Sequence, residues 1–146
     1  MFSSAVRSIL ALALLGSPLG WAASGPQKPL QVERIGAIQL ADQARQDPSA
    51  EQACRAWGLS VQQANGFFAL SEIQDSRALH DSFDWMPCHL EGSLRDANGQ
   101  TWRFEINPAA TASTWQPGGD RFFWGCWQAA CEPLVLMMPT PPGAEY

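Results

Sequence analysis

The residues Thr101-Trp102-Arg103-Phe104-Glu105-Ile106-Asn107 alternate strictly between apolar and polar side chains. Trp102, Phe104 and Ile106 are apolar, whereas every residue between and beside them is polar or charged. Because successive side chains of a β-strand point to opposite faces, this stretch predicts a strand with one dry and one solvated face. A sheet of such strands buries one face against helices or a second layer.

Further strands are predicted on both sides of this stretch. Residues 88–94 alternate in a similar way. Between the two stretches, Asp96-Ala97-Asn98-Gly99 contains an Asn-Gly pair, which favours a hairpin turn because both central residues can take positive φ. Three more strands are expected after Pro108, at 111–115, 121–126 and 134–138. Together these segments predict an antiparallel meander sheet of roughly five strands.

Two short helices are predicted before the sheet. Ser60, followed three residues later by Gln63, is a capping-box pattern, and the same spacing begins at Ser49. Helices are therefore expected at 49–57 and 61–73. The predicted fold class is α+β, with two short N-terminal helices packed on one face of a disulfide-stapled sheet.

Residues 1–22 have the three parts of a secretory signal peptide. Arg7 precedes the apolar stretch 9–15, and a Gly/Pro break with small residues follows. The apolar stretch is shorter than the roughly 20 residues that a membrane-spanning helix needs. We expect cleavage after Ala22, with no membrane span in the mature chain. The protein would then reside in a bacterial periplasm or outside the cell.

The remaining residues, 23–146, are of a length that fits a single globular domain. Residues 23–31 contain two prolines and are expected to form a loose leader. Partial alternation over 32–40 permits a short strand. The proline-rich residues 139–146 are expected to fray.

Four cysteines in an exported chain predict two disulfides. Cys126 and Cys131 are near enough in sequence to close a small loop, which leaves Cys54 to pair with Cys88. A zinc site is the alternative, but the sequence lacks paired C-x-x-C knuckles and oxidised thiols are poor metal ligands. We expect no metal. Phosphate loops, dinucleotide fingerprints and haem attachment motifs are also absent from the sequence, so we expect no cofactor.

The acidic charge balance and the lack of catalytic motifs argue against several classes of function. The chain has 14 acidic and 9 basic residues and a formal net charge of −5, so nucleic-acid binding is not expected. The sequence has no G-x-S-x-G serine elbow. Asp81, Asp84 and Glu91 cluster near the first strand of the predicted meander and suit glycoside cleavage in type, but solvated loop charges explain them more simply. No catalytic residue is predicted.

Aromatic residues are the main indication of function. Rings alternate across both faces of the stretch 121–126, so one face packs under the helices and the other needs a covering loop or a partner. Tryptophan anchors are common in protein interfaces and in sugar-binding platforms. The predicted binding residues are Trp124, Trp127 and Gln128, with Trp127 and Gln128 at the tip of the disulfide-closed loop.

The segment Gly125-Cys126-Trp127-Gln128-Ala129-Ala130-Cys131, followed by aliphatic residues and methionine, resembles the inhibitory loop of periplasmic inhibitors of vertebrate-type lysozyme. In that family the disulfide loop enters the active-site cleft of the enzyme, and a histidine of the loop makes the decisive polar contacts. The loop of this chain has no histidine. The resemblance is confined to this loop and the residues up to Met138, and it implies a protein partner.

Two classes of function follow from the sequence. The preferred one is an exported, non-enzymatic binding protein of the inhibitor or immunity type. Such a protein would neutralise an envelope-acting enzyme or toxin through its aromatic, disulfide-closed loop, since a preorganised loop lowers the ordering cost of binding. The alternative is an envelope-associated hydrolase or glycan-binding accessory protein that uses loop carboxylates and aromatic platforms.

Overall fold

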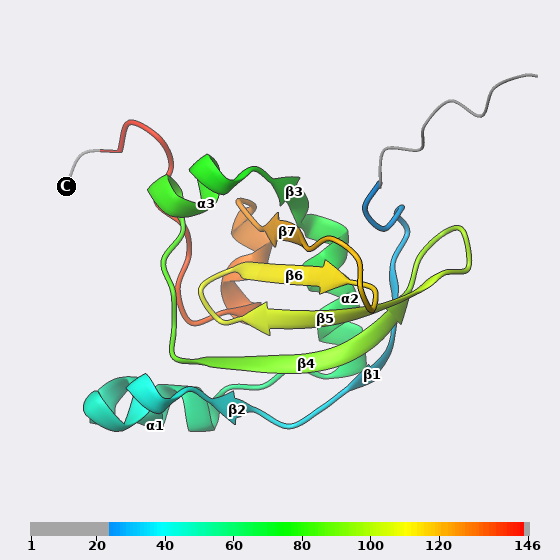
Figure 1. The fold of residues 1–146 in the computed structure, drawn as a ribbon. Coiled ribbons are helices and arrows are strands. Elements are labelled where there is room, and N and C mark those ends of the chain that lie inside the picture. The colour runs from blue at the N-terminus through cyan, green and yellow to red at the C-terminus, as the bar shows by residue number, and fades with distance from the viewer. Residues whose placement is uncertain (1–23, 145–146) are drawn as a thin grey trace, which may run out of the picture.

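The computed structural model describes residues 24–144. The predicted signal peptide, with its cleavage point after Ala22, lies outside the described residues. The elements follow in chain order (Figure 1): β1 Gln31–Ile35, β2 Gln39–Leu40, the 3-10 helix η1 Asp42–Gln46, α1 Pro48–Ala56, α2 Val61–Leu70, β3 Glu72–Gln74, α3 Ser76–Ser82, β4 Cys88–Arg95, β5 Thr101–Asn107, β6 Thr111–Trp115, β7 Phe122–Gly125 and the 3-10 helix η2 Ala129–Leu134.

The fold is α+β and is organised by one antiparallel sheet, as expected from the sequence. Its strand order is β1-β4-β5-β6-β7-β3, and β2 also pairs with β4. Strands β4 to β7 correspond to four of the five strands of the predicted meander. The sheet has seven strands rather than roughly five, because β1, β2 and β3 add to the two ends of the meander. Strands β1 and β2 fall in the region 31–40, where the sequence permitted a short strand, whereas β3 has three residues and its pairing with β7 leaves little pattern in the sequence.

Residues 134–138 do not form the expected strand. The helix η2 begins inside the loop that the Cys126–Cys131 disulfide closes and runs to Leu134, and β3 takes the position beside β7. The backbone N–H groups of Leu136 and Met137 both donate to the carbonyl of Pro108, at 2.8 and 3.1 Å. The prediction was wrong because an apolar run alone does not distinguish a strand from a connection that packs on the core.

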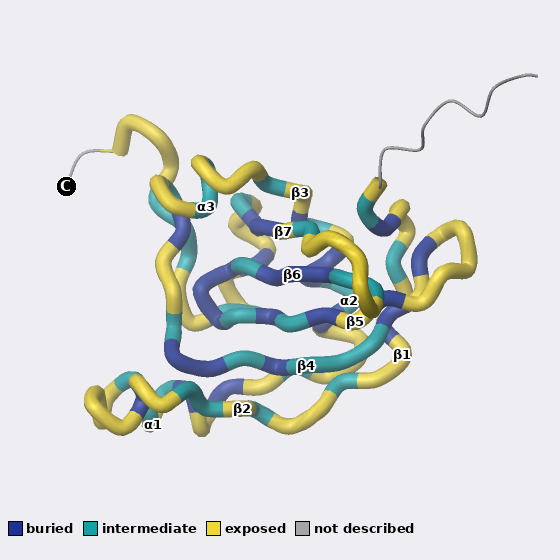
Figure 2. The backbone as a smooth tube through the Cα atoms, in the orientation of Figure 1, coloured by how far each residue is buried: buried dark blue, intermediate teal, exposed yellow. Residues whose placement is uncertain are grey.

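Helix α2 covers the apolar face of the sheet and lies behind it in Figure 1. Phe67 and Phe68 of α2 are fully buried. The Phe68 ring makes edge-to-face contacts with Phe104 and Trp124, with ring centroids 5.3 and 6.0 Å apart. The core therefore sits between α2 and the central strands, and Figure 2 shows buried residues along β4, β5 and β6.

Helix α1 does not share this role, although both predicted helices were expected on the same face. Cys54 is the one buried residue of α1, and its disulfide to Cys88 ties the helix to the start of β4. Trp57, directly after α1, supplies the apolar contact instead: its side chain joins the core and its indole N–H donates to the Leu134 carbonyl at 3.0 Å. A short helix with few apolar residues is therefore held mainly by its disulfide.

The helix ends test the capping predictions. Ser60 and Gln63 form the predicted capping box, with hydrogen bonds of 3.1 and 2.9 Å. Helix α1 is capped by Asp47, whose carboxylate accepts from the backbone N–H of Ser49 and Ala50, so the capping role predicted for Ser49 was wrong. Helix α2 ends before the expected residue 73, because β3 begins at Glu72 and pairs with β7.

Helix α3 was not predicted. The Asp75 carboxylate caps it by accepting from the Ala78 N–H at 2.8 Å. None of the described residues 76–82 is buried, so α3 has no apolar stripe that would mark a helix in the sequence.

Part of the expected loose leader, residues 24–30, is held by hydrogen bonds to the turn after β4 and to the C-terminal end of α2. The Gln27 carbonyl accepts from the Ala97 N–H at 2.8 Å. The Lys28 ammonium donates to the carbonyls of Ala69 and Ser71. These contacts join polar groups to distant backbone, which a search for apolar patterns does not detect.

Candidate functional site

The face of the sheet opposite α2 is open. In Figure 1 it faces the viewer, and no helix among residues 24–144 lies across it. We call it the open face and define it by the outward-pointing side chains of β4 to β7 and of Arg121. These are His89, Glu91, Ser93, Arg103, Glu105, Ser113, Trp115, Arg121 and Phe123.

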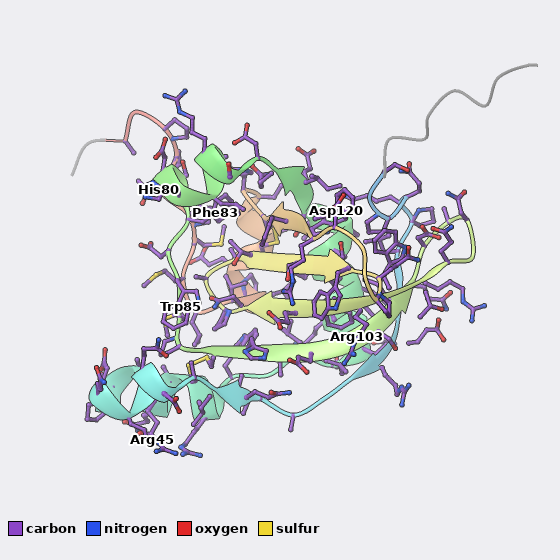
Figure 3. The ribbon with its side chains drawn as sticks, in the orientation of Figure 1. Arg45, His80, Phe83, Trp85, Arg103 and Asp120 are labelled. Carbon is purple, nitrogen blue, oxygen red and sulfur yellow. A yellow bond between two sulfur atoms is a disulfide. The ribbon has the colours of Figure 1, made fainter. Side chains whose placement is uncertain are left out.

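Two hollows lie along the open face. The first, of about 520 Å³, lies between the sheet and the segment from α3 to β4, and its lining includes Trp85, Glu105 and Phe123. The second, of about 640 Å³, lies toward β1, and its lining includes Arg103 and Trp115. In Figure 3, Trp85 lies beside the start of β4 and Arg103 on β5, toward opposite sides of the view.

Asn107 fixes the wall of the first hollow. Its side-chain amide donates to the carbonyls of Met86 and Cys88 at 2.8 and 3.3 Å, and its oxygen accepts from the Met86 N–H at 3.2 Å. The segment that carries Trp85 is therefore held against the end of β5. Trp85 is nevertheless 59% exposed, and Phe123 is 42% exposed.

Charged groups occupy the middle of the open face. His89 Nε2 lies 3.1 Å from a carboxylate oxygen of Glu91, and Glu91 stands directly opposite Glu105 in the register of β4 and β5. Arg121 Nη1 lies 3.6 Å from Glu105 and donates to Ser113 Oγ at 3.1 Å.

Arg121 is also held from its other side. Its guanidinium carbon lies 3.9 Å from the centroid of the Trp115 ring, a distance at which a cation is attracted to the ring face. Trp115, Ser113 and Glu105 thus fix the position of the Arg121 head group on a half-exposed surface. The open face presents ordered positive and negative groups beside its two exposed rings.

Trp124, one of the predicted binding residues, lies in the core. It is 2% exposed, and its indole N–H donates to Thr114 Oγ1 at 3.0 Å within the core. Alternation along β7 directs Trp124 toward α2 and its neighbour Phe123 toward the open face. Both faces of β7 carry aromatic rings, so the sequence alone does not indicate which face is buried.

Trp127 and Gln128 do not lie at a hairpin tip, because the disulfide loop leads into η2. The half-buried Trp127 ring packs on Phe83 with centroids 4.7 Å apart, and its indole N–H donates to Gln74 at 3.3 Å. Gln128 is exposed, and its side chain donates to the Leu70 carbonyl at 3.4 Å. The Trp127 ring is thus engaged inside the molecule, whereas Gln128 stays accessible.

The disulfides join Cys54 to Cys88 and Cys126 to Cys131, which are the pairs that the sequence favoured. All four sulfurs are therefore oxidised, and none can act as a nucleophile or as a thiolate ligand.

The three carboxylates that seemed to cluster in the sequence do not meet. Asp84 lines the first hollow and Glu91 the second, whereas Asp81 lines a third hollow between α3 and residues 140–144. The residues that do come together are His89, Glu91 and Glu105. The signal for this cluster was present, since His89 and Glu91 are two apart on one strand and Glu105 lies on the polar face of the next. Only the register of β4 and β5 brings them into contact.

Comparison with protein-family models, with curated proteins and with solved structures finds no match for this chain. Within residues 24–144, no helix is both long enough and apolar enough to cross a membrane.

Proposed function

We propose that the protein is an exported, non-enzymatic binding protein of the inhibitor or immunity type, which neutralises an envelope-acting enzyme or toxin. The proposed binding surface is the open face rather than the disulfide loop. The observation that carries this proposal is the pair of exposed aromatic residues, Phe123 and Trp85, which line one hollow of that face.

The composition of the open face supports a protein partner. Interface hot spots are commonly aromatic residues and arginine, surrounded by polar groups that exclude water. Phe123 and Trp85 fit the first description, and Arg121 is already ordered by Trp115. Because Arg121 is held in place before binding, it loses less freedom when a partner binds, and more of its interaction energy remains available for affinity.

Charge and cysteine usage are in keeping with this proposal. The formal net charge of −5 would steer a cationic partner toward the protein. Two disulfides are typical of proteins that fold in an oxidising compartment such as the periplasm.

The proposal is tested by affinity capture from an envelope extract, using the wild-type protein and two variants. Phe123→Ser removes an exposed ring from the open face, and Leu136→Ser removes a side chain of equal exposure, 42%, from the connection after η2. The proposal expects one enzyme to be retained by the wild type and by Leu136→Ser, to be lost with Phe123→Ser, and to lose activity when the wild type is added. Retention of the same enzyme by Phe123→Ser would contradict it.

A second candidate is the envelope-associated hydrolase or glycan-binding accessory protein. It is favoured by Trp85 and Glu105, which line the same hollow, and by Glu91 opposite Glu105, because an aromatic platform beside two carboxylates suits a sugar ligand. Incubation of the purified protein with cell-wall glycan separates the two candidates. Release of soluble fragments that stops with Glu91→Gln would favour the hydrolase, whereas unchanged glycan together with enzyme capture would favour the inhibitor.

A further inference from the structure

We propose that the open face holds a divalent transition-metal ion of the zinc type, bound by His89, Glu91 and Glu105. One ring nitrogen of His89 and one carboxylate oxygen from each glutamate lie within 4.8 Å of one another. Ligand atoms around a zinc ion lie about 2.0–2.2 Å from it, and hence roughly 3–4 Å from each other. Small side-chain rotations would therefore bring all three ligand atoms within bonding distance of one zinc ion.

The backbone places these three residues without help from a flexible loop. His89 and Glu91 are two residues apart on β4, so both side chains leave the same face. Glu105 is the direct register partner of Glu91 on β5. Ligands held on paired strands are fixed more precisely than ligands on loops, which favours a defined site.

The electrostatics of the cluster favour a cation. Two glutamates directly opposite each other on one sheet face repel. Arg121, 3.6 Å from Glu105, contributes one positive charge, and His89 adds a second only when it is protonated. A divalent ion between the two carboxylates would remove the repulsion, and neutral His89 would serve as its nitrogen ligand.

The donor set indicates the class of metal. Imidazole with carboxylates suits zinc and related transition metals, whereas calcium and magnesium prefer oxygen ligands alone. Three protein ligands leave a coordination position for water or for a group of a bound molecule. Arg121, held by Ser113 and Trp115, would orient Glu105 from outside the ligand set, as supporting residues of metal sites do.

No metal was expected from the sequence, because only the register of β4 and β5 brings His89, Glu91 and Glu105 together. The inference does not depend on the proposed function, because metal binding is measured on the purified protein without a partner.

Calorimetric titration of the EDTA-treated, dialysed protein with zinc tests the site. One zinc ion should bind per chain, and His89→Gln and Glu91→Gln should each weaken binding by about tenfold or more. The matched control is His80→Gln, because His80 also lies 3.1 Å from a carboxylate, that of Asp81, but is on α3 outside the cluster. This control should bind zinc as the wild type does. Equal affinity in all four proteins, or no saturable binding by the wild type, would overturn the proposal.

A second measurement needs no variant and so does not depend on how the variants fold. The chain has two histidines, so the NMR spectrum of its imidazole groups contains the signals of His80 and His89. Zinc at one equivalent should shift the ring signals of His89 and leave those of His80 unchanged. Unchanged His89 signals, or equal shifts at both rings, would show that the cluster does not hold the metal.

Discussion

Glu91 on β4 stands directly opposite Glu105 on β5, on the face of the sheet that no described helix covers. Like charges in this position destabilise a sheet, and here they lie at the centre of a face that also presents exposed rings. Local rules of stability are most often broken at functional sites. The unfavourable Glu91–Glu105 pair therefore indicates that the open face is the functional surface of the protein.

The repulsion between these glutamates should be measurable as stability in metal-free buffer. Glu91→Gln removes one of two like charges and should raise the free energy of unfolding by about 0.2–1 kcal/mol. Glu105→Gln removes the same repulsion but also the partner of Arg121, so its effect should be smaller. Urea denaturation with EDTA present measures both values. A loss of more than about 1 kcal/mol in Glu91→Gln would show that the pair is not repulsive.

Asp96 organises the turn between β4 and β5. Its carboxylate accepts hydrogen bonds from one indole and three backbone N–H groups, those of Trp102, Gln27, Asn98 and Gln100. Burial alone would raise the pKa of the Asp96 carboxyl, but these hydrogen bonds outweigh burial and hold the pKa below its ordinary value.

Stability should therefore depend on pH through Asp96. A lowered pKa in the folded state means that the ionised carboxylate stabilises the fold above the unfolded-state pKa of about 3.9, and that this contribution is lost as pH falls through the folded-state value. The free energy of unfolding should fall more steeply below about pH 4 in the wild type than in Asp96→Asn. Asp120→Asn, in the turn before β7, serves as control and should follow the wild type. Parallel curves for wild type and Asp96→Asn would contradict the assigned role.

Two glycines should respond in opposite directions to alanine. A Cβ at Gly92 would lie 2.1 Å from the Arg34 carbonyl oxygen and 2.5 Å from the Phe104 ring, so Gly92→Ala should destabilise the β1–β4 pairing by about 1–3 kcal/mol. A Cβ at Gly66 would have no neighbour within 4 Å, so Gly66→Ala should stabilise α2 by about 0.5–1 kcal/mol. Thermal denaturation of both variants checks the signs. Equal effects would mean that β1 does not approach β4 as described.

Most of the correct predictions rest on patterns formed by residues that are close together in the sequence. The alternation in Thr101–Asn107, the Ser60–Gln63 capping box and the turn at Asn98-Gly99 depend on neighbouring residues, and all three are present in the structure. In the turn, Gly99 has the positive φ of 77° and Asn98 does not, so the pair forms the turn without using both left-handed positions.

The features that escaped prediction depend on distant partners. Strand β3 exists because Glu72–Gln74 pairs with β7, and Trp124 is buried because α2 covers that side of the sheet. The cluster at the open face requires the register between β4 and β5. Residues 134–138 were instead predicted as a strand that is absent, because their apolar run packs beside the core without entering the sheet.

The most direct test of the open face as the binding surface is site-specific photocrosslinking in living cells of the source organism. A photoreactive phenylalanine analogue replaces Phe123 in one variant, Leu136 in a second and Gln128 in a third; these residues lie on the open face, on the connection after η2 and in the disulfide loop. We predict a discrete adduct with an envelope protein from position 123 and none from position 136. An adduct from position 128 alone, with none from position 123, would contradict the proposal and restore the disulfide loop as the binding element.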